Sequence, residues 1–491
     1  MTVRVRCAPS PTGHLHIGVT RTALFNYLYA KKYGGQFLLR IEDTDRERSK
    51  EEYVRSILEG FEWLGLVPDE PPVRQSERIE YYAKQLQRLV SEGKAYRCDC
   101  SRERLEELRK RQMAEGANPR YDGHCRDRSD VAEQGSVIRL RTPDEGSVSI
   151  EDRILGSVTV GMDEIDDFVI AKSDGTPTYQ FAVVADDRAQ AVTLVLRGND
   201  LLSSTPKQVL LYQALGWEIP EFAHLPMILG SDKQKLSKRH GATSLLAYRA
   251  MGYLPQAMRN YLVRLGWSHG DQEVFQFDET IEKFSLEAIA KAAAVFNPEK
   301  LLWLNGEHIR LCSVAELTDA WIDHLEKLES DQIYLERGGE PEKGLGLKIP
   351  DLYFLKAGEN RRWVERLVEA CQVRSATLVE LTEHAWPFLV ESVDYDPGAV
   401  KKVLTPPARE PLERVRDWVE SQDSLPSEED IHDFLNSLVE DLGLKMGKVA
   451  QPVRVSVTGR TVSPPIDTTM ALLGRERVLD RIERGLRLIP G

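Results

Sequence analysis

The pattern of apolar and polar residues in the first part of the chain alternates between the strand period and the helix period. Apolar side chains at every second position predict a strand over residues 3–7, and helical spacing predicts a helix over residues 20–33. A short apolar strand follows at residues 36–41, and Ser49 with Glu52 forms the capping-box pattern that starts a second helix. Strand, helix, strand and helix in succession predict a parallel sheet with helical crossovers.

The pattern changes after residue 97. A polar helix is expected over residues 101–113, and short strands over residues 137–141 and 147–150. A near-continuous apolar run at residues 192–196 then returns to the type of strand that lies inside a parallel sheet. We therefore expect an α/β domain that is split by an α+β insertion. From residue 244 onward the chain reads as helical.

Composition indicates a soluble protein of several domains. The chain has 491 residues, of which 41% are hydrophobic and 29% are charged, and this length suits about three or more packed domains. The six cysteines do not form a disulfide scaffold in a chain of this length, the N-terminus lacks the apolar core of a signal peptide, and no apolar run is long enough to span a membrane. We expect a cytoplasmic protein without a membrane partner.

Charge is distributed unevenly along the chain. The formal net charge is −13, which by itself is unlike that of a nucleic-acid-binding protein. Between residues 445 and 487, however, lysine and arginine outnumber aspartate and glutamate. This end of the chain suits a phosphate backbone, and it suits equally a solvated amphipathic helix with a basic outer face.

Two loops carry the residue types that handle phosphate. Residues 9–18 lie between the first strand and the first helix, where a helix N-terminus presents unpaired N–H groups, and they include two histidines and two glycines. Residues 235–239 read Lys-Leu-Ser-Lys-Arg, which suits a loop that closes over a triphosphate and neutralises charge on the pyrophosphate. Taken singly, a loop like the first is more often a structural turn, and a basic run like the second is much more often a surface loop.

Together and in this order, the two loops resemble the paired HIGH and KMSKS signatures of the class I aminoacyl-tRNA synthetases. The first signature stands here as His16-Ile17-Gly18-Val19. Val19 replaces the final histidine of the class, at a position that varies in the glutamyl branch. Longer strings resemble the glutamyl-tRNA synthetases over essentially the whole chain: Arg-Cys-Ala-Pro-Ser-Pro-Thr-Gly at 6–13, Arg-Thr-Ala-Leu-Phe-Asn at 21–26, Arg-Ile-Glu-Asp-Thr-Asp at 40–45, Ser-Asp-Gly-Thr-Pro-Thr-Tyr at 173–179 and Val-Ala-Gln-Pro-Val-Arg at 449–454.

The resemblance implies a monomer that activates L-glutamate with ATP and Mg²⁺, releases pyrophosphate, and transfers glutamate to the 3′-terminal adenosine of tRNA-Glu with release of AMP. It implies that Arg6 and Arg197 bind the side-chain carboxylate of glutamate, with Ser10 and Tyr179 as hydrogen-bonding neighbours and Glu42 near the ammonium group. Arginine suits this task, because a guanidinium pairs bidentately with a carboxylate and gains little from the neutral amide of glutamine.

The same resemblance assigns the nucleotide site. Its ATP-binding residues would be His16, Gly18, Asp200 and Lys238. The catalytic residues would be His16, Lys235 and Lys238, which would stabilise charge on the phosphates. No side-chain nucleophile is needed, because the substrate carboxylate attacks the α-phosphorus and the ribose hydroxyl attacks the mixed anhydride.

A candidate zinc site lies in the insertion. Cys98, Cys100 and Cys125 offer three thiolates, and tetrahedral zinc needs one further ligand. The resemblance implies Asp127 as the fourth ligand, with Tyr121 or His124 as alternatives. Reduced, metal-free thiols are the competing interpretation.

Five segments are expected from the pattern and the resemblance together. These are the first half of a Rossmann-like catalytic domain (1–97), an inserted acceptor-stem-binding domain (98–189), the second catalytic half (190–243), a helical stem-contact region (244–324) and a helical anticodon-binding region (325–491). The helical residues after 325 argue against a truncated tRNA-modifying relative, which lacks an anticodon module. A small-molecule adenylyltransferase, which shares the nucleotide fold, and a non-catalytic tRNA-binding paralogue are competing interpretations of the whole chain.

Overall fold

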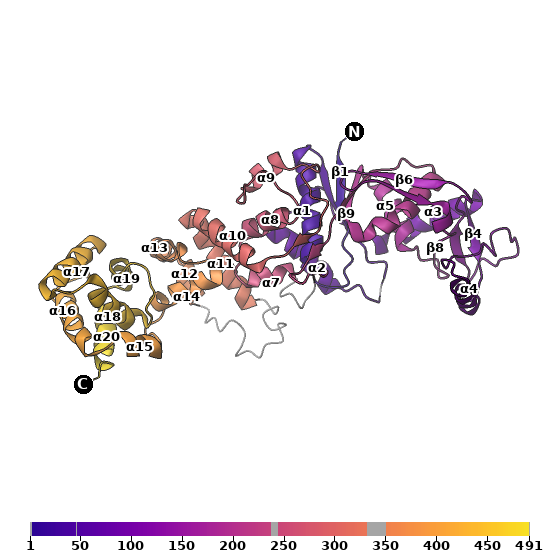
Figure 1. Cartoon of the computed structure of the whole chain (residues 1–491). Helices are drawn as coiled ribbons and strands as arrows, with labels where there is room; N and C mark the ends of the chain where they lie inside the picture. Colours follow the sequence, from indigo (N-terminus) through magenta and orange to yellow (C-terminus); the bar gives the residue numbers. More distant parts are fainter. Residues whose placement is uncertain (1, 46, 237–243, 331–349, 491) are drawn as a thin grey trace. The chain divides into compact units, whose positions relative to one another are not determined.

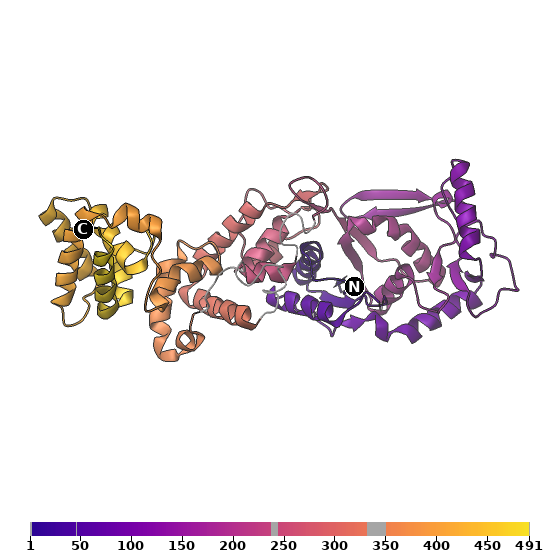
Figure 2. The same ribbon diagram turned by 90° about the horizontal axis from the view of Figure 1, so that it is seen from below.

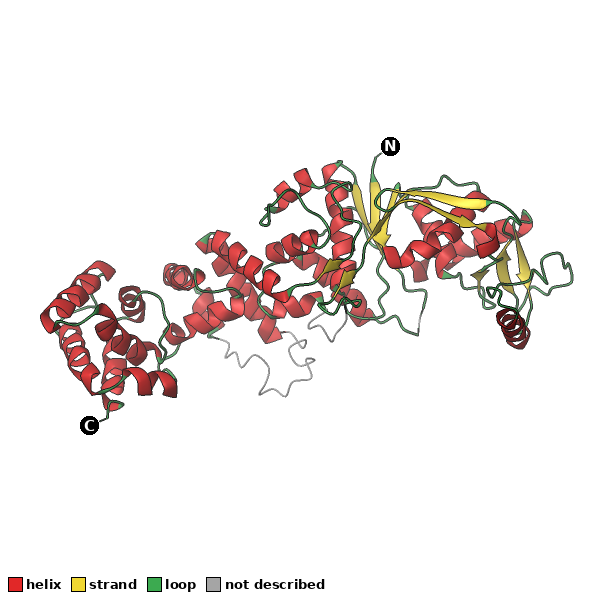
Figure 3. Cartoon of the chain, viewed as in Figure 1, coloured by secondary structure: helices red, strands yellow, loops and turns green. Residues whose placement is uncertain are grey.

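The structure is a computed structural model that describes residues 2–45, 47–236, 244–330 and 350–490 (Figure 1). The chain forms two compact units. The first comprises Met1–Leu246 and Met258–Pro298, and the second comprises Ala247–Ala257 and Glu299–Gly491. Strands occur only in the first unit among the described residues, as the yellow arrows in Figure 3 show.

The N-terminal part of the first unit has the predicted strand and helix order. Strands β1 (Arg4–Cys7), β2 (Gln36–Ile41) and β3 (Val73–Arg74) pair in parallel, and α1 (Ile17–Lys32) and α2 (Glu51–Trp63) follow β1 and β2. The predicted strands and crossover helices are therefore confirmed.

The predicted capping box at the start of α2 is wrong. Lys50, not Ser49, is the residue that precedes the first helical turn, and it makes no side-chain cap. The backbone N–H of Lys50 donates instead to the carbonyl of Pro11 at 3.2 Å. This contact with the first loop sets where the helix begins.

A second sheet has the order β7-β6-β10-β9. It contains β6 (Ser147–Asp152), β7 (Gly156–Gly161), β9 (Leu194–Gly198) and β10 (Glu221–Leu225). Strand β10 is parallel to both β9 and β6, whereas β6 and β7 form an antiparallel hairpin. The residue before β9 joins this sheet to the first, because the N–H of Thr193 donates to the carbonyl of Arg4 at 2.9 Å.

The hairpin of β6 and β7 falls inside the segment expected as the insertion. It nevertheless extends the sheet that contains β9, and in Figure 2 it is the pair of long purple-magenta ribbons. This sheet and the neighbouring helices α3 (Ile79–Ser91), α5 (Tyr179–Ala189) and α6 (Thr205–Leu215) contribute to one apolar core. The part of the insertion with its own small sheet contains β4 (Ala95–Cys98), β5 (Val137–Leu140), β8 (Val169–Ala171) and the helix α4 (Arg102–Ala114).

The remaining elements of the chain up to residue 311 are mostly helical. They are α7 (Leu245–Ala250), α8 (Pro255–Arg264), α9 (Phe277–Lys283) and α10 (Pro298–Leu311), together with the two-stranded pair β11 (Ile228–Leu229) and β12 (Ala294–Val295). A 3₁₀ segment, η3 (Asn199–Ser204), follows β9 directly.

The second unit is helical throughout its described residues, as predicted. From α11 (Val314–Ser330) its helices are α12 (Leu352–Lys356), α13 (Arg361–Gln372), α14 (Leu378–Leu389), α15 (Pro397–Val403), α16 (Arg409–Glu420), α17 (Glu428–Leu442), α18 (Met446–Thr458), α19 (Ile466–Leu473) and α20 (Arg475–Arg487). They share one apolar core, in which Trp321 is fully buried. No helix in the described ranges has the length and apolar character that a bilayer span requires.

Candidate active site

A cleft of about 460 Å³ opens where β1 and β9 end and α1 begins. Ligands of open α/β sheets bind at this position, because the carboxyl ends of parallel strands leave a crevice there. The cleft is lined by Arg6, Cys7, Ala8, Pro9, Ser10, Thr12, Gly13, His14, Leu15, His16, Gly18, Val19, Arg21, Thr22, Glu42, Ile57, Tyr179, Arg197, Gly198, Asp200, Leu201, Leu225, Pro226, Met227, Ile228, Lys235 and Leu236.

His16 caps the N-terminus of α1 at the mouth of the cleft. Its Nδ1 accepts a hydrogen bond from the backbone N–H of Gly18 at 2.9 Å, so Nδ1 carries no proton and the neutral ring has its proton on Nε2. Burial and then the charge of Lys235 lower the pKa of His16. A Cβ on Gly18 would lie 2.6 Å from the His16 ring, which explains why this position is glycine. The arrangement offers a neutral N–H donor beside the positive end of a helix.

Arg6 lies at the floor of the cleft in a buried network of opposite charges. Its side chain is 4% exposed, and its Nε and Nη2 donate to the two carboxylate oxygens of Asp187 at 3.0 and 3.2 Å. Arg40 donates to the same carboxylate at 2.7 Å and lies 3.5 Å from Glu42. Burial alone would lower the pKa of Arg6, but the charge of Asp187, the hydrogen bond to it and the charge of Glu42 together outweigh burial and hold the pKa above its ordinary value.

Arg197 is also buried, but no carboxylate among the described residues pairs with it. Its side chain is 3% exposed, its Nε donates to His224 Nε2 at 3.1 Å, and its Nη2 donates to the Thr205 hydroxyl at 2.9 Å. Its Nη1 is buried and has no hydrogen-bond partner within the part of the chain that the structure describes. Burial lowers the pKa of Arg197. A buried guanidinium on the wall of a cleft, with one donor that no described residue accepts from, has the chemistry to bind an anionic group.

The other predicted amino-acid-binding residues line the same cleft. Tyr179 is the first residue of α5, and burial followed by the charge of Glu42 raises its pKa. Burial likewise raises the pKa of Glu42, although Arg40 and Arg6 oppose the change. Ser10 lies at the exposed rim of the first loop.

The predicted nucleotide residues fall partly within the described structure. Asp200 and Lys235 line the cleft, and their side chains form an exposed ion pair at 3.5 Å. Lys238, predicted as a catalytic and ATP-binding residue, lies outside the described residues. The cleft therefore brings together every predicted substrate and nucleotide residue that the structure describes.

Several residues that hold the site were not found from the sequence. Asp187 and Arg40 complete the network around Arg6, and His224 and Asp152 lie behind Arg197. All four come from strands or helices far apart in the chain, so spacing gives no signal for them. A pair of adjacent aspartates, Asp186 and Asp187, directly after the apolar run of residues 181–185 is the hint that the sequence offers.

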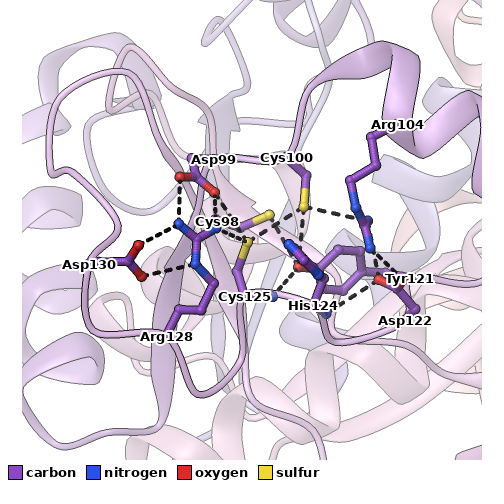
Figure 4. Close-up of polar contacts among 10 residues, drawn as sticks. All are labelled: Cys98, Asp99, Cys100, Arg104, Tyr121, Asp122, His124, Cys125, Arg128 and Asp130. Atoms are coloured by element: carbon purple, nitrogen blue, oxygen red, sulfur yellow. Dashed lines mark hydrogen bonds and ion pairs between the residues drawn. The ribbon is translucent and has the colours of Figure 1, made fainter.

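Three cysteines of the insertion converge, as Figure 4 shows. The Sγ atoms of Cys98, Cys100 and Cys125 all lie within 4.8 Å of one another, and those of Cys100 and Cys125 are 3.5 Å apart. Tetrahedral zinc with Zn–S bonds of about 2.3 Å holds its sulfurs about 3.8 Å apart. Two arginines also lie close to the sulfurs. Arg104 Nη1 is 3.6 Å from Cys100 Sγ, and Arg128 Nη1 is 3.7 Å from Cys125 Sγ. The donor set fits zinc.

Of the three candidate fourth ligands, Tyr121 lies against the sulfurs. Its Oη is 3.4 Å from Cys98 Sγ and 3.7 Å from Cys100 Sγ. Asp127, the predicted ligand, is exposed and forms an ion pair with Arg141 at 3.0 Å instead. Neither Asp127 nor His124 belongs to the group of converging ligand atoms in the described part of the chain. The Asp127 carboxylate thus lies beside Arg141 and not within the cluster of sulfurs.

Comparisons with known proteins cover nearly the whole chain. A family model described as the catalytic domain of class I tRNA synthetases (E and Q) matches residues 2–303, and a model described as an anticodon binding domain matches residues 324–486. Glutamate–tRNA ligase 1 of Alkalilimnicola ehrlichii is 51% identical over 487 residues, which are 99% of this chain and 98% of that protein. Glutamate–tRNA ligase of Syntrophobacter fumaroxidans is 47% identical with the same coverage.

A solved structure is similar over the same length. It is the crystal structure of a glutamate tRNA ligase from Elizabethkingia meningosepticum in complex with its amino acid, with 32% identity, a TM-score of 0.81 and 99% of each chain covered.

Proposed function

This chain belongs to the class I tRNA synthetases for glutamate and glutamine, and we propose that it is a glutamate–tRNA ligase. It is an ATP-dependent enzyme with a class I catalytic domain and a helical anticodon-binding domain. The anticodon-domain match distinguishes it from the truncated tRNA-modifying relative. We propose that it acts as a cytoplasmic monomer on L-glutamate, ATP with Mg²⁺, and tRNA-Glu.

One observation supports glutamate in particular as the substrate. The guanidinium of Arg197 lines the cleft together with Arg6, and its buried Nη1 has no hydrogen-bond partner among the described residues. A side-chain carboxylate would satisfy this donor and compensate its charge, whereas the neutral amide of glutamine would leave a buried cation without a counter-charge. Glu42, 8% exposed at its side chain, would face the substrate ammonium, and Tyr179 and Ser10 would donate the remaining hydrogen bonds.

ATP would occupy the opposite end of the cleft. The Nε2–H of His16 and the N-terminus of α1 would bind phosphate oxygens, and Asp200 would lie near the ribose. The apolar side chains of Met227, Ile228 and Leu236 offer a surface for the base. Lys235 and Lys238 would add positive charge around the leaving pyrophosphate.

Catalysis then consists of positioning and charge stabilisation. An oxygen of the substrate α-carboxylate attacks the α-phosphorus of ATP, the α–β phosphoanhydride bond breaks, and pyrophosphate leaves with Mg²⁺. The ribose hydroxyl of the terminal adenosine of tRNA next attacks the carbonyl carbon of glutamyl-adenylate. AMP leaves with the bonding electron pair, and the hydroxyl proton is lost to the product phosphate or to solvent.

Charging of three tRNAs side by side tests this function. With ATP and glutamate, purified protein should form glutamyl-tRNA with tRNA-Glu and should leave tRNA-Asp uncharged; charging of tRNA-Gln would define a broader tRNA range with the same amino acid. Adenylylation of a small metabolite without charging of any tRNA would indicate an adenylyltransferase. Binding of tRNA without chemistry would indicate a non-catalytic paralogue.

We also propose that the insertion binds one zinc ion through Cys98, Cys100, Cys125 and Tyr121. When bound, zinc would cross-link the residues after β4 to the loop that contains Tyr121 and would stabilise the insertion rather than take part in the reaction. The support is the converging sulfurs, the phenolic oxygen beside them and the neighbouring arginines, which would offset the negative charge of the ligands.

Metal analysis of ligand variants checks this proposal. Unchelated wild-type protein should contain about one zinc per chain, and Cys125→Ser should contain none and should melt at a lower temperature. Tyr121→Phe should lose zinc to a chelator faster than wild type, whereas Asp127→Ala should not differ from wild type. Retention of zinc in Tyr121→Phe together with its loss in Asp127→Ala would reverse the assignment of the fourth ligand.

A further inference from the structure

A line of three buried polar residues crosses adjacent strands behind the cleft. Arg197 on β9 and His224 on β10 are direct partners in the parallel ladder, so their side chains lie on one face of the sheet. Arg197 Nε is 3.1 Å from His224 Nε2, and His224 Nδ1 is 2.6 Å from the Oδ2 of Asp152 on β6. The side chains of Asp152 and His224 are fully buried.

The chemistry of the two outer residues fixes the tautomer of His224. An arginine Nε–H can only donate, so Nε2 of His224 must accept, and an ionised carboxylate can only accept, so Nδ1 must carry the proton. Burial lowers the pKa of His224 by more than the hydrogen bond to Asp152 raises it, which is consistent with a neutral ring. The hydroxyl of Thr205, 3.2 Å from Nε2, is compatible with the same tautomer.

Asp152 is itself fixed by the backbone. Its Oδ1 accepts hydrogen bonds from the N–H groups of Ile154 at 3.0 Å and Leu155 at 2.8 Å. This leaves Oδ2 to accept from His224. Burial would raise the pKa of Asp152, but these hydrogen bonds lower it below its ordinary value, so the group is ionised.

We propose that Asp152 and His224 are positioning residues that aim the guanidinium of Arg197 at the substrate's side-chain carboxylate. Asp152 selects the Nδ1–H tautomer of His224, His224 holds Arg197 Nε, and Thr205 holds Arg197 Nη2, so Nη1 is the donor left for the substrate. This role rests on the proposed glutamate specificity. This positioning role extends the amino-acid site to β6, a strand in the segment that was expected as the insertion.

Asp152→Asn is the decisive variant, because it keeps the shape of the side chain and reverses the tautomer. The N–H groups of Ile154 and Leu155 retain the amide oxygen at the Oδ1 position. The amide NH₂ then faces His224 Nδ1 and donates to it, which moves the ring proton to Nε2. An Nε2–H facing the Nε–H of Arg197 is repulsive, and Arg197 loses its fixed orientation.

The expected result is a selective effect on glutamate. The KM for glutamate should rise by about 10- to 100-fold, which corresponds to loss of one hydrogen bond to a charged group, while the KM values for ATP and tRNA stay at the wild-type level. A purely structural defect would instead lower kcat through a smaller active fraction and leave the KM for glutamate unchanged.

Two substitutions at His224 separate its bond to Asp152 from its bond to Arg197, and only one of them should preserve the KM for glutamate. An asparagine amide reaches about as far as Nδ1, so His224→Asn can keep the bond to Asp152 but cannot reach Arg197; a glutamine amide reaches about as far as Nε2, so His224→Gln can accept from Arg197. The KM for glutamate should therefore rise in His224→Asn and stay near wild type in His224→Gln. The reverse order, or equal KM values in both, would overturn the proposal.

Asp167→Asn is a matched control in the same unit. Asp167 is a buried carboxylate that accepts from the Tyr96 hydroxyl at 2.6 Å and from the Thr142 N–H at 2.8 Å. Its substitution should lower the melting temperature without changing the KM for glutamate. If wild type charges tRNA with glutamate and Asp152→Asn has the same KM for glutamate, the positioning role fails while the proposed function stands. If wild type does not use glutamate, the proposed function itself fails.

Discussion

Arg197→Ala should lower kcat/KM for glutamate by about 10³-fold, or about 4 kcal/mol, since removal of one member of a buried charge pair costs about 2–5 kcal/mol. The physical reason is that the substrate carboxylate would lose a buried, cleft-lining guanidinium whose Nη1 has no partner and to which no carboxylate of the described structure is bound. Steady-state charging with varied glutamate measures the effect, and the KM for ATP should not change.

Arg197→Lys is the matched variant for this prediction. It keeps a positive charge but has no planar fork to bond with His224, Thr205 and the substrate at once. Its kcat/KM for glutamate should fall between that of Arg197→Ala and that of wild type. An unchanged KM for glutamate in the alanine variant would remove Arg197 from the amino-acid site.

Asp187→Asn should produce the largest loss of stability together with loss of activity. Asp187 is the shared partner of Arg6 and Arg40, all three being buried. Breaking a buried ion pair from one side costs about 3–5 kcal/mol, because it leaves buried charge uncompensated. Chemical denaturation measures the loss, and Glu92→Gln, which breaks exposed pairs with Arg88 and Lys94, should cost far less.

The stabilisation by Asp187 also depends on pH. Burial by itself would raise the pKa of Asp187, but the charges of Arg6 and Arg40 outweigh burial and hold it below its ordinary value. A carboxyl group whose pKa is lower in the folded state contributes stability above its unfolded pKa of about 3.9, and this contribution is lost as pH falls through the folded pKa. The difference in free energy of unfolding between wild type and Asp187→Asn should therefore be constant near neutral pH and shrink below about pH 4. A difference that grows towards acid pH would contradict the assigned pairing.

The local features of the catalytic region could be predicted from the sequence, because they depend on short-range patterns. Alternating apolar residues give β1 and β2, helical spacing gives α1, and the loop between them carries His16 at the helix N-terminus. The grouping of Cys98 and Cys100 with Cys125 could also be predicted, from residue type alone.

What could not be predicted depends on tertiary pairing. The insertion contributes β6 to the sheet of β9, which brings Asp152 to His224 across a large separation in sequence. The residue before α2 is Lys50, which bonds to the first loop, rather than Ser49, and the Asp127 carboxylate pairs with Arg141 rather than lying beside the cysteines. In each case the local sequence allows a polar group several hydrogen-bond or ion-pair partners. Only the folded arrangement determines which of them it contacts.

In the proposed function, selection of glutamate over glutamine would depend on the buried guanidinium of Arg197, to which no carboxylate of the described residues is bound. The decisive experiment compares kcat/KM of the wild-type enzyme for the two amino acids, with the same ATP and tRNA-Glu. A preference for glutamate of about 10³-fold or more is expected, because the amide would leave Arg197 buried and uncompensated. Equal use of glutamine, or a preference for it, would show that Arg197 does not set the choice of amino acid.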